Sequence, residues 1–196
     1  FDLMALGGRS NFLCELRIVD DDGRPLPRDG VATGHLMAKG PIIAGGYFKG
    51  ENDPMDAEGW MHTGDLASLR PDGYVVLRDR SKDVIKSGGE WISTVQIEGI
   101  AAGHPAVLYA AVIAVPHPKW QERPLLVIVP REGHAIGREE MLAYLKDRIA
   151  SWWMPDDVVV RQSMPISGTG KILKRELREE YKDYVLPSLR EGSAAQ

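Results

Sequence analysis

The chain has 196 residues, 43% of them hydrophobic, and a formal net charge of −4, which is enough material to bury one large or two small hydrophobic cores. Residues 1–80 contain 9 Lys/Arg and 13 Asp/Glu, and residues 81–196 contain 15 of each, so neither half has the basic excess of a nucleic-acid-binding protein. The one cysteine, Cys14, excludes an internal disulfide and is typical of a reducing compartment, so we expect a cytoplasmic protein.

Residues 1–80 predict short strands separated by turns. Strand candidates lie at residues 12–19, 34–38, 66–69 and 74–77. The last two flank Arg70-Pro71-Asp72-Gly73, a turn in which the proline presets φ and the glycine accepts a positive φ. The glycine-rich, acidic stretch 45–59 predicts an irregular surface loop. This half is therefore expected to be a small antiparallel β subdomain.

Residues 81–196 predict strands that alternate with helices. Ser93 to Gln96 has the pattern of a capping box, so a helix begins there with Val95, Ile97 and Ile100 available for burial. β-branched, apolar runs predict strands, and apolar residues at helical spacing predict helices. The strands are 107–115, 125–129 and 158–160; the helical positions are Met141, Leu142, Leu145 and Ile149, then Leu173, Leu177, Tyr181 and Tyr184. The longest apolar run, 107–116, is about half the length of a membrane-spanning helix, so no membrane span is expected. The fold class expected for the whole chain is α+β.

Thr63-Gly64-Asp65 is the first of three segments that could form part of a binding or catalytic site. A carboxylate at a strand edge can accept two hydrogen bonds from the cis-diol of a ribose, and a glycine lets a ligand approach the backbone closely. The alternative is a turn in which Asp65 bonds only local N–H groups.

The second segment covers residues 79–93, and its charges alternate in sign where the two halves of the chain meet. A solvated linker between domains would have the same pattern. Gly88-Gly89, followed by Trp91 and Ile92, instead favours a loop that lets a slender ligand pass close to the backbone.

Pro165 to Lys171 is the third segment, Pro-Ile-Ser-Gly-Thr-Gly-Lys, and it superficially resembles a phosphate-binding P-loop. It differs twice, because Pro165 replaces the first glycine and Ile172 replaces the Ser or Thr after the lysine. A nucleotide triphosphatase is therefore disfavoured. Lys171 remains a candidate for a point charge directed at a phosphate or carboxylate.

In their order and spacing, these three segments resemble the late core motifs of the adenylate-forming superfamily. Residues 82–93 and 116–120 resemble medium-chain fatty-acyl-CoA ligases and the related methylmercaptopropionate-CoA ligases. The resemblance covers essentially the whole chain and corresponds to about the last third of such an enzyme, a class far longer than one typical domain. The start at Phe1 rather than Met also favours a fragment.

The resemblance implies a role for each matching residue. Residues 1–80 would end the AMP-binding N-terminal domain, and residues 81–196 would be the mobile C-terminal domain. Relatives with small substrates carry Arg or Tyr where this chain has Glu90-Trp91, which favours a thiol-side or packing role there over a phosphate contact. The implied roles are a ribose contact for Asp65, a ribose or phosphate contact for Arg80, a hinge at Lys82, a CoA-binding segment of Gly88, Gly89, Glu90 and Trp91, and adenylation for Lys171.

The reaction implied is ATP-dependent formation of an acyl-adenylate, followed by transfer of the acyl group to CoA. The carboxylic acid would be a fatty acid of medium chain length. Mg²⁺ would be held upstream, so no metal site is expected in this chain. Without the N-terminal remainder of the enzyme, the fragment is expected to be inactive. The alternative is a non-catalytic nucleotide- or partner-binding module that keeps the C-terminal fold.

Overall fold

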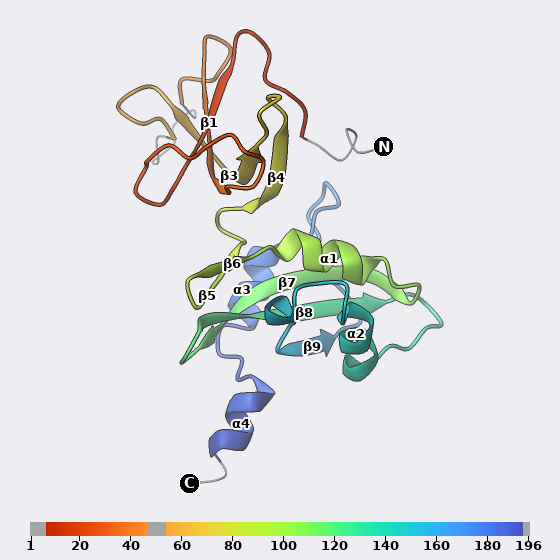
Figure 1. Cartoon of the computed structure of the whole chain (residues 1–196). Helices are drawn as coiled ribbons and strands as arrows, with labels where there is room; N and C mark the ends of the chain where they lie inside the picture. Colours follow the sequence, from red (N-terminus) through yellow and green to blue (C-terminus); the bar gives the residue numbers. More distant parts are fainter. Residues whose placement is uncertain (1–6, 47–53, 194–196) are drawn as a thin grey trace. The chain divides into compact units, whose positions relative to one another are not determined.

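The computed structural model describes residues 7–46 and 54–193 (Figure 1). The chain divides into two compact units, Phe1–Lys82 and Asp83–Gln196. This division lies two residues after the boundary expected from the sequence.

The first unit is a four-stranded antiparallel sheet in the order β1-β2-β3-β4. The strands are β1 (Glu15–Val19), β2 (Gly34–Lys39), β3 (Met61–Leu69) and β4 (Val75–Arg80). The predicted turn joins β3 to β4, with Gly73 at φ +85° and its N–H bonded to the Arg70 carbonyl at 2.9 Å. β3 begins five residues earlier than predicted, so Thr63-Gly64-Asp65 lies within a strand. Residues 47–53 of the expected surface loop lie outside the described residues.

The second unit contains a five-stranded sheet in the order β6-β5-β8-β7, with β9 parallel to β8. The other strand pairs are antiparallel. The strands are β5 (Ile85–Ser87), β6 (Glu90–Ile92), β7 (Val107–His117), β8 (Gln121–Pro130) and β9 (Asp157–Val160). The helices are α1 (Thr94–Ala102), α2 (Arg138–Leu145), the 3₁₀ helix η2 (Ser151–Trp153), α3 (Lys174–Glu180) and α4 (Pro187–Ser193). The fold class is α+β, as predicted.

Side chains alternate between the two faces of the second sheet, and each face has its own core. Val112 and Leu126 belong to the cluster that contains residues of α1 and α2. Their neighbours Ile113 and Leu125 belong to the cluster that contains Leu177 of α3. Because β7 and β8 are covered on both faces, their sequences are nearly continuous apolar runs.

Three local predictions about helices need correction. Ser93 does cap α1, with the Gln96 N–H donating to its Oγ at 3.4 Å, but Val95 is 52% exposed because the buried face of α1 is Thr94, Ile97 and Ala101. Ile149 lies beyond the end of α2, and α3 ends at Glu180. Tyr181 and Tyr184 still pack on the core, from the turn after α3.

Candidate functional site

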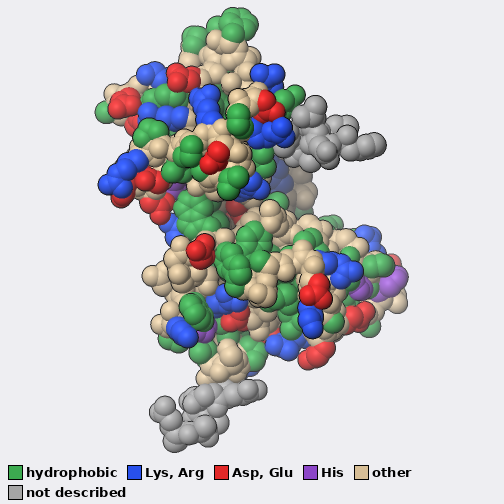
Figure 2. Space-filling model, viewed as in Figure 1, with side chains coloured by type: hydrophobic (Ala, Val, Ile, Leu, Met, Phe, Trp, Pro, Cys, Tyr) green, Lys and Arg blue, Asp and Glu red, His purple; other side chains and the backbone are tan. Residues whose placement is uncertain are grey.

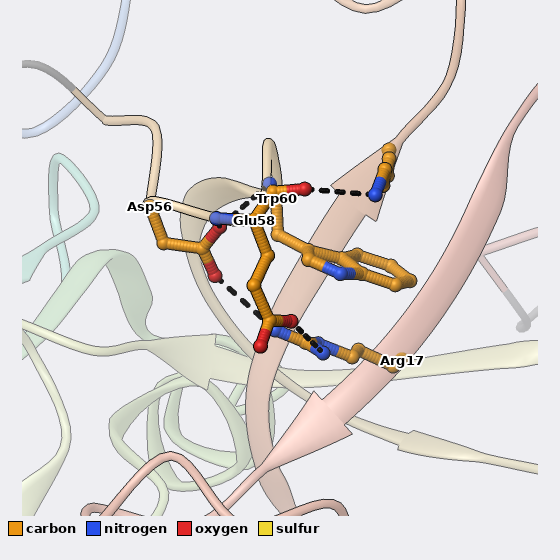
Figure 3. Close-up of polar contacts among 5 residues, drawn as sticks. Arg17, Asp56, Glu58 and Trp60 are labelled. Carbon is orange, nitrogen blue, oxygen red and sulfur yellow. Dashed lines mark hydrogen bonds and ion pairs between the residues drawn. The ribbon is translucent and has the colours of Figure 1, made fainter.

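The start of β3 is held by an Arg–Trp cluster (Figure 3). The Arg17 guanidinium of β1 lies 4.1 Å from the Trp60 ring centroid and forms ion pairs with Asp56 at 3.2 Å and Glu58 at 3.3 Å. The Trp60 N–H donates to Asp56 Oδ1 at 2.8 Å, and this bond is the main cause that lowers the pKa of Asp56. The cluster fixes the chain immediately before Thr63-Gly64-Asp65.

Asp65 and Arg80 face each other across β3 and β4. Arg80 Nε lies 2.9 Å from Asp65 Oδ1, with the two side chains 57% and 25% exposed. Gly64 has a φ of +76°, and the Thr63 hydroxyl accepts from the Asp65 N–H at 3.2 Å. A carboxylate has about four lone-pair positions, so the ion pair leaves Asp65 able to accept further hydrogen bonds from a diol.

Lys82, the predicted hinge, lies in an exposed turn between two anchored residues. On one side, the Ser81 N–H donates to the Gly64 carbonyl at 2.9 Å. On the other, Asp83 pairs with Arg178 of α3 at 2.7 Å. Within residues 7–46 and 54–193, Lys82 itself has no such contact.

Gly88 and Gly89 form the two-residue turn of the β5–β6 hairpin, in which Ser87 pairs with Glu90. Their φ values are +59° and +89°, and the turn type with positive φ at both central positions strongly favours glycine. The Gly88 N–H donates to the Trp120 carbonyl at 3.0 Å. A Cβ at position 88 would lie 2.9 Å from Trp120 Cε3, whereas one at position 89 would meet nothing within 4 Å. A loop was predicted at these two glycines, and in the structure they form a defined hairpin turn.

A pocket of about 400 Å³ opens beside this hairpin. Two of the four predicted CoA-binding residues line it, Gly88 and Glu90, whereas Gly89 and Trp91 do not. The remaining lining residues are Ser87, Trp120, Arg123 and Trp152. The structure brings them together through the pairing of Ser87 with Gln121 and the packing of η2, two long-range contacts that no short sequence motif reveals. Trp152 is 44% exposed, whereas Trp153 packs against the core.

Lys171 lies on an internally hydrogen-bonded turn. The Ser167 N–H donates to the Lys171 carbonyl at 2.8 Å, the Lys171 N–H donates to Ser167 Oγ at 3.1 Å, and Gly170 has a φ of +82°. Lys171 is exposed, and its ammonium group has no partner in the part of the chain that the structure describes. The turn thus presents a free cation on a fixed backbone.

Lys174, three residues later, has a different environment. Its ammonium lies 2.7 Å from a Glu98 carboxylate oxygen and donates to Thr94 Oγ1 at 2.8 Å, and its side chain is 15% exposed. Lys174 is therefore a structural cation that ties α3 to α1, and Lys171 is the one available to a ligand.

Among residues 7–46 and 54–193, His, Cys, Asp and Glu side chains form no group of three or more that could hold a metal ion. No helix in this same part of the chain is long and apolar enough to cross a bilayer. On the face that Figure 2 shows, basic and acidic side chains are interspersed in both units.

Comparison with known families gives a match in the second unit. Residues 96–171 match the model of the AMP-binding enzyme C-terminal domain. The matched residues include the Lys171 turn, Trp120, Arg123 and Trp152.

Named relatives of the chain are CoA ligases. A 3-methylmercaptopropionyl-CoA ligase from Ruegeria lacuscaerulensis is 53% identical over 90% of this chain and 33% of the relative. A medium-chain-fatty-acid–CoA ligase from Ectopseudomonas oleovorans is 46% identical over 92% of the chain and 33% of the relative. The chain thus spans about a third of the length of the curated relatives it matches.

The fold of the chain is also similar to that of a solved structure. ATP-bound MatB from Rhodopseudomonas palustris matches with a TM-score of 0.81 at 31% identity, over 91% of this chain and 36% of MatB. This match supports the α+β assignment across both units.

Proposed function

We propose that this chain is the C-terminal part of an AMP-forming acyl-CoA synthetase, an acid–thiol ligase of the cytoplasm. A carboxylate would attack the α-phosphorus of ATP, which releases pyrophosphate and gives an acyl-adenylate. The CoA thiol would then displace AMP to form the thioester. The observation that carries the proposal is the free Lys171 ammonium on its fixed turn, within a domain of the AMP-binding family.

Each half-reaction would use different residues of the chain. In adenylation, Asp65 and Arg80 would hold the ribose and phosphate of the nucleotide. Lys171 would stabilise negative charge that develops on the transferred phosphate. By the family resemblance, the Mg²⁺ that accompanies ATP would be held by residues of the N-terminal remainder.

In thioester formation, the Gly88–Gly89 hairpin and its pocket would receive CoA. The pocket is lined by two tryptophans and is open beside a backbone without a Cβ atom at position 88. A narrow, flexible arm such as pantetheine can pass along such a surface. Lys119, whose ammonium lies 4.5 Å from the Trp120 ring centroid, puts a positive charge near this rim for a phosphate.

The acid substrate is proposed as a fatty acid of medium chain length, with 3-methylmercaptopropionate as the second candidate. The named relatives include a ligase for each. Octanoate and 3-methylmercaptopropionate, compared in parallel, would separate the two.

The test is to measure the two half-reactions separately on the full-length protein that contains this chain. We expect acid-dependent ATP–pyrophosphate exchange and, from supplied acyl-adenylate, CoA thioester formation. Lys171→Ala should lower the first rate by about 10²–10³ and leave the second nearly unchanged, with an unaltered melting curve. The 196-residue chain alone should do neither.

Two outcomes would contradict this assignment. A parallel loss of both rates in folded Lys171→Ala would remove Lys171 from the adenylation step. A full-length protein that catalyses neither half-reaction would instead favour the non-catalytic binding module.

A further inference from the structure

The pocket beside the hairpin has walls from three separate segments of the second unit. Ser87 and Gly88 come from β5 and its turn, Trp120 and Arg123 from the start of β8, and Trp152 from η2. A ligand in the pocket would touch all three walls, so its position depends on the spacing between them.

Arg123 belongs to the β8 wall and donates hydrogen bonds to the other two walls of the pocket. Its Nη1 donates to Ser87 Oγ at 3.2 Å and to the Trp152 carbonyl at 3.0 Å. Its Nη2 donates to the Met154 carbonyl at 3.0 Å. Its Nε donates to Asp156 Oδ1 at 2.7 Å. All three guanidinium nitrogens thus bind protein acceptors.

The burial of this guanidinium argues for a role beyond packing. Arg123 and Asp156 are only 13% and 18% exposed. Burying an ion pair costs desolvation, and apolar residues of the same volume are often as stabilising. What a guanidinium adds is a rigid, planar set of directional donors. Here those donors join the turn, β8 and η2 into one frame.

We propose that Arg123 is a positioning residue for CoA in the thioester-forming half-reaction. It holds the Ser87–Gly88 wall and the Trp152 wall at a fixed separation, while its own nitrogens stay bonded to the protein. The proposal rests on the function proposed above. It assigns Arg123 to thioester formation alone and not to adenylation. Because a displacement of about 1 Å can cost roughly 10²-fold in rate, loss of this frame should be visible kinetically.

The experiment compares Arg123→Gln and Arg123→Lys in the full-length ligase. Arg123→Gln should raise the KM for CoA about tenfold or more, and kcat at saturating CoA should fall less. Acid-dependent pyrophosphate exchange should stay within about twofold, because adenylation does not use this pocket. Arg123→Lys keeps the charge but not the planar fork, so its KM should lie between wild type and Arg123→Gln.

Arg161→Gln is the matched control. Arg161 forms an ion pair of the same length, 2.7 Å, with Glu180, and it does not line the pocket. This variant should keep the wild-type KM for CoA. If it raises that KM as much as Arg123→Gln does, the effect is general to the unit and the proposal is overturned.

Each of the following results supports or overturns the proposed role of Arg123. An unchanged KM for CoA in folded Arg123→Gln, or an equal fall in adenylation, overturns it. If the Arg123 variants do not fold, Ser87→Ala decides, because it removes one acceptor and leaves the charge pair intact: a raised KM for CoA supports the proposal and an unchanged one refutes it. A wild-type protein without either half-reaction would overturn the proposed function itself, and this role with it.

Discussion

Gly88 and Gly89 are adjacent and share a turn, yet their surroundings differ. An alanine at either position must adopt a positive φ, which costs roughly 1–2 kcal/mol. At position 88 the added Cβ also meets the Trp120 ring at 2.9 Å, and a shift of that ring adds on the order of 1 kcal/mol or more. Gly88→Ala should therefore lower the free energy of unfolding by more than Gly89→Ala. Guanidinium unfolding of the two variants measures this difference, and equal losses would show that Trp120 moves at no cost.

The roles of single residues could be predicted from the sequence only where a short motif carries them. Lys171 was found through its glycine-flanked segment, and the structure adds the reason to prefer it over Lys174, whose ammonium is bound to Glu98. Arg123 was missed because its four partners lie 36, 29, 31 and 33 residues away along the chain. Trp152 was not distinguished from Trp153, because two neighbouring tryptophans give no sign of which one is exposed.

Among the elements, the segment after α3 is stabilised by a hydrogen bond whose donor, the Tyr184 hydroxyl, can lose its proton. Burial, and then the bond that the Tyr184 hydroxyl donates to Asp157 at 2.5 Å, raise the pKa of Tyr184 from 10.0 to about 12. As the pH rises, the Tyr184 hydroxyl therefore loses its proton in the unfolded state before it does so in the folded state. The contribution of this hydroxyl to the stability of the fold is complete below pH 10.0 and is lost as the pH rises to about 12. Tyr184→Phe should lower stability at pH 8 by about 1 kcal/mol and remove this part of the alkaline decline.

Thermal unfolding of wild type and Tyr184→Phe between pH 8 and pH 12 measures both effects. Tyr109→Phe, at a 36% exposed position of β7, is the control and should retain the wild-type pH profile. If Tyr184→Phe retains that profile as well, the bond to Asp157 does not contribute to alkaline stability.

Elements could be predicted where their own sequence carries a clear apolar pattern. The strands predicted at 107–115 and 125–129 lie within β7 and β8, where both faces are buried and the apolar runs are continuous. The final helix was predicted too long because Tyr181 and Tyr184 have helical spacing, but a turn also brings them to the core. The β5–β6 hairpin was not predicted because its sequence is dominated by charges and glycine, and its pairing with β8 is a tertiary contact.

At the scale of the whole molecule, the chain passes from the first compact unit to the second between Lys82 and Asp83. The proposed enzyme needs Lys171 near the nucleotide in one step and the Gly88–Gly89 pocket near the acyl-adenylate in the next. One unit must then turn relative to the other, as in a hinge closure. The backbone is anchored at Ser81 and Asp83, so we expect the φ and ψ of Lys82 to be the ones that change at least cost.

Lys82→Pro in the full-length ligase tests this hinge. Lys82 is outside the positive-φ region, so proline can be accommodated, but it fixes φ near −65° and restricts Ser81 as well. If the fixed state is the adenylating one, pyrophosphate exchange should continue while thioester formation falls on the order of 10²-fold. Lys82→Ala, which removes the side chain but leaves the backbone free, is the control and should keep both rates. An equal loss of both half-reactions in a folded Lys82→Pro variant would mean that Lys82 acts in catalysis or folding and not as the hinge.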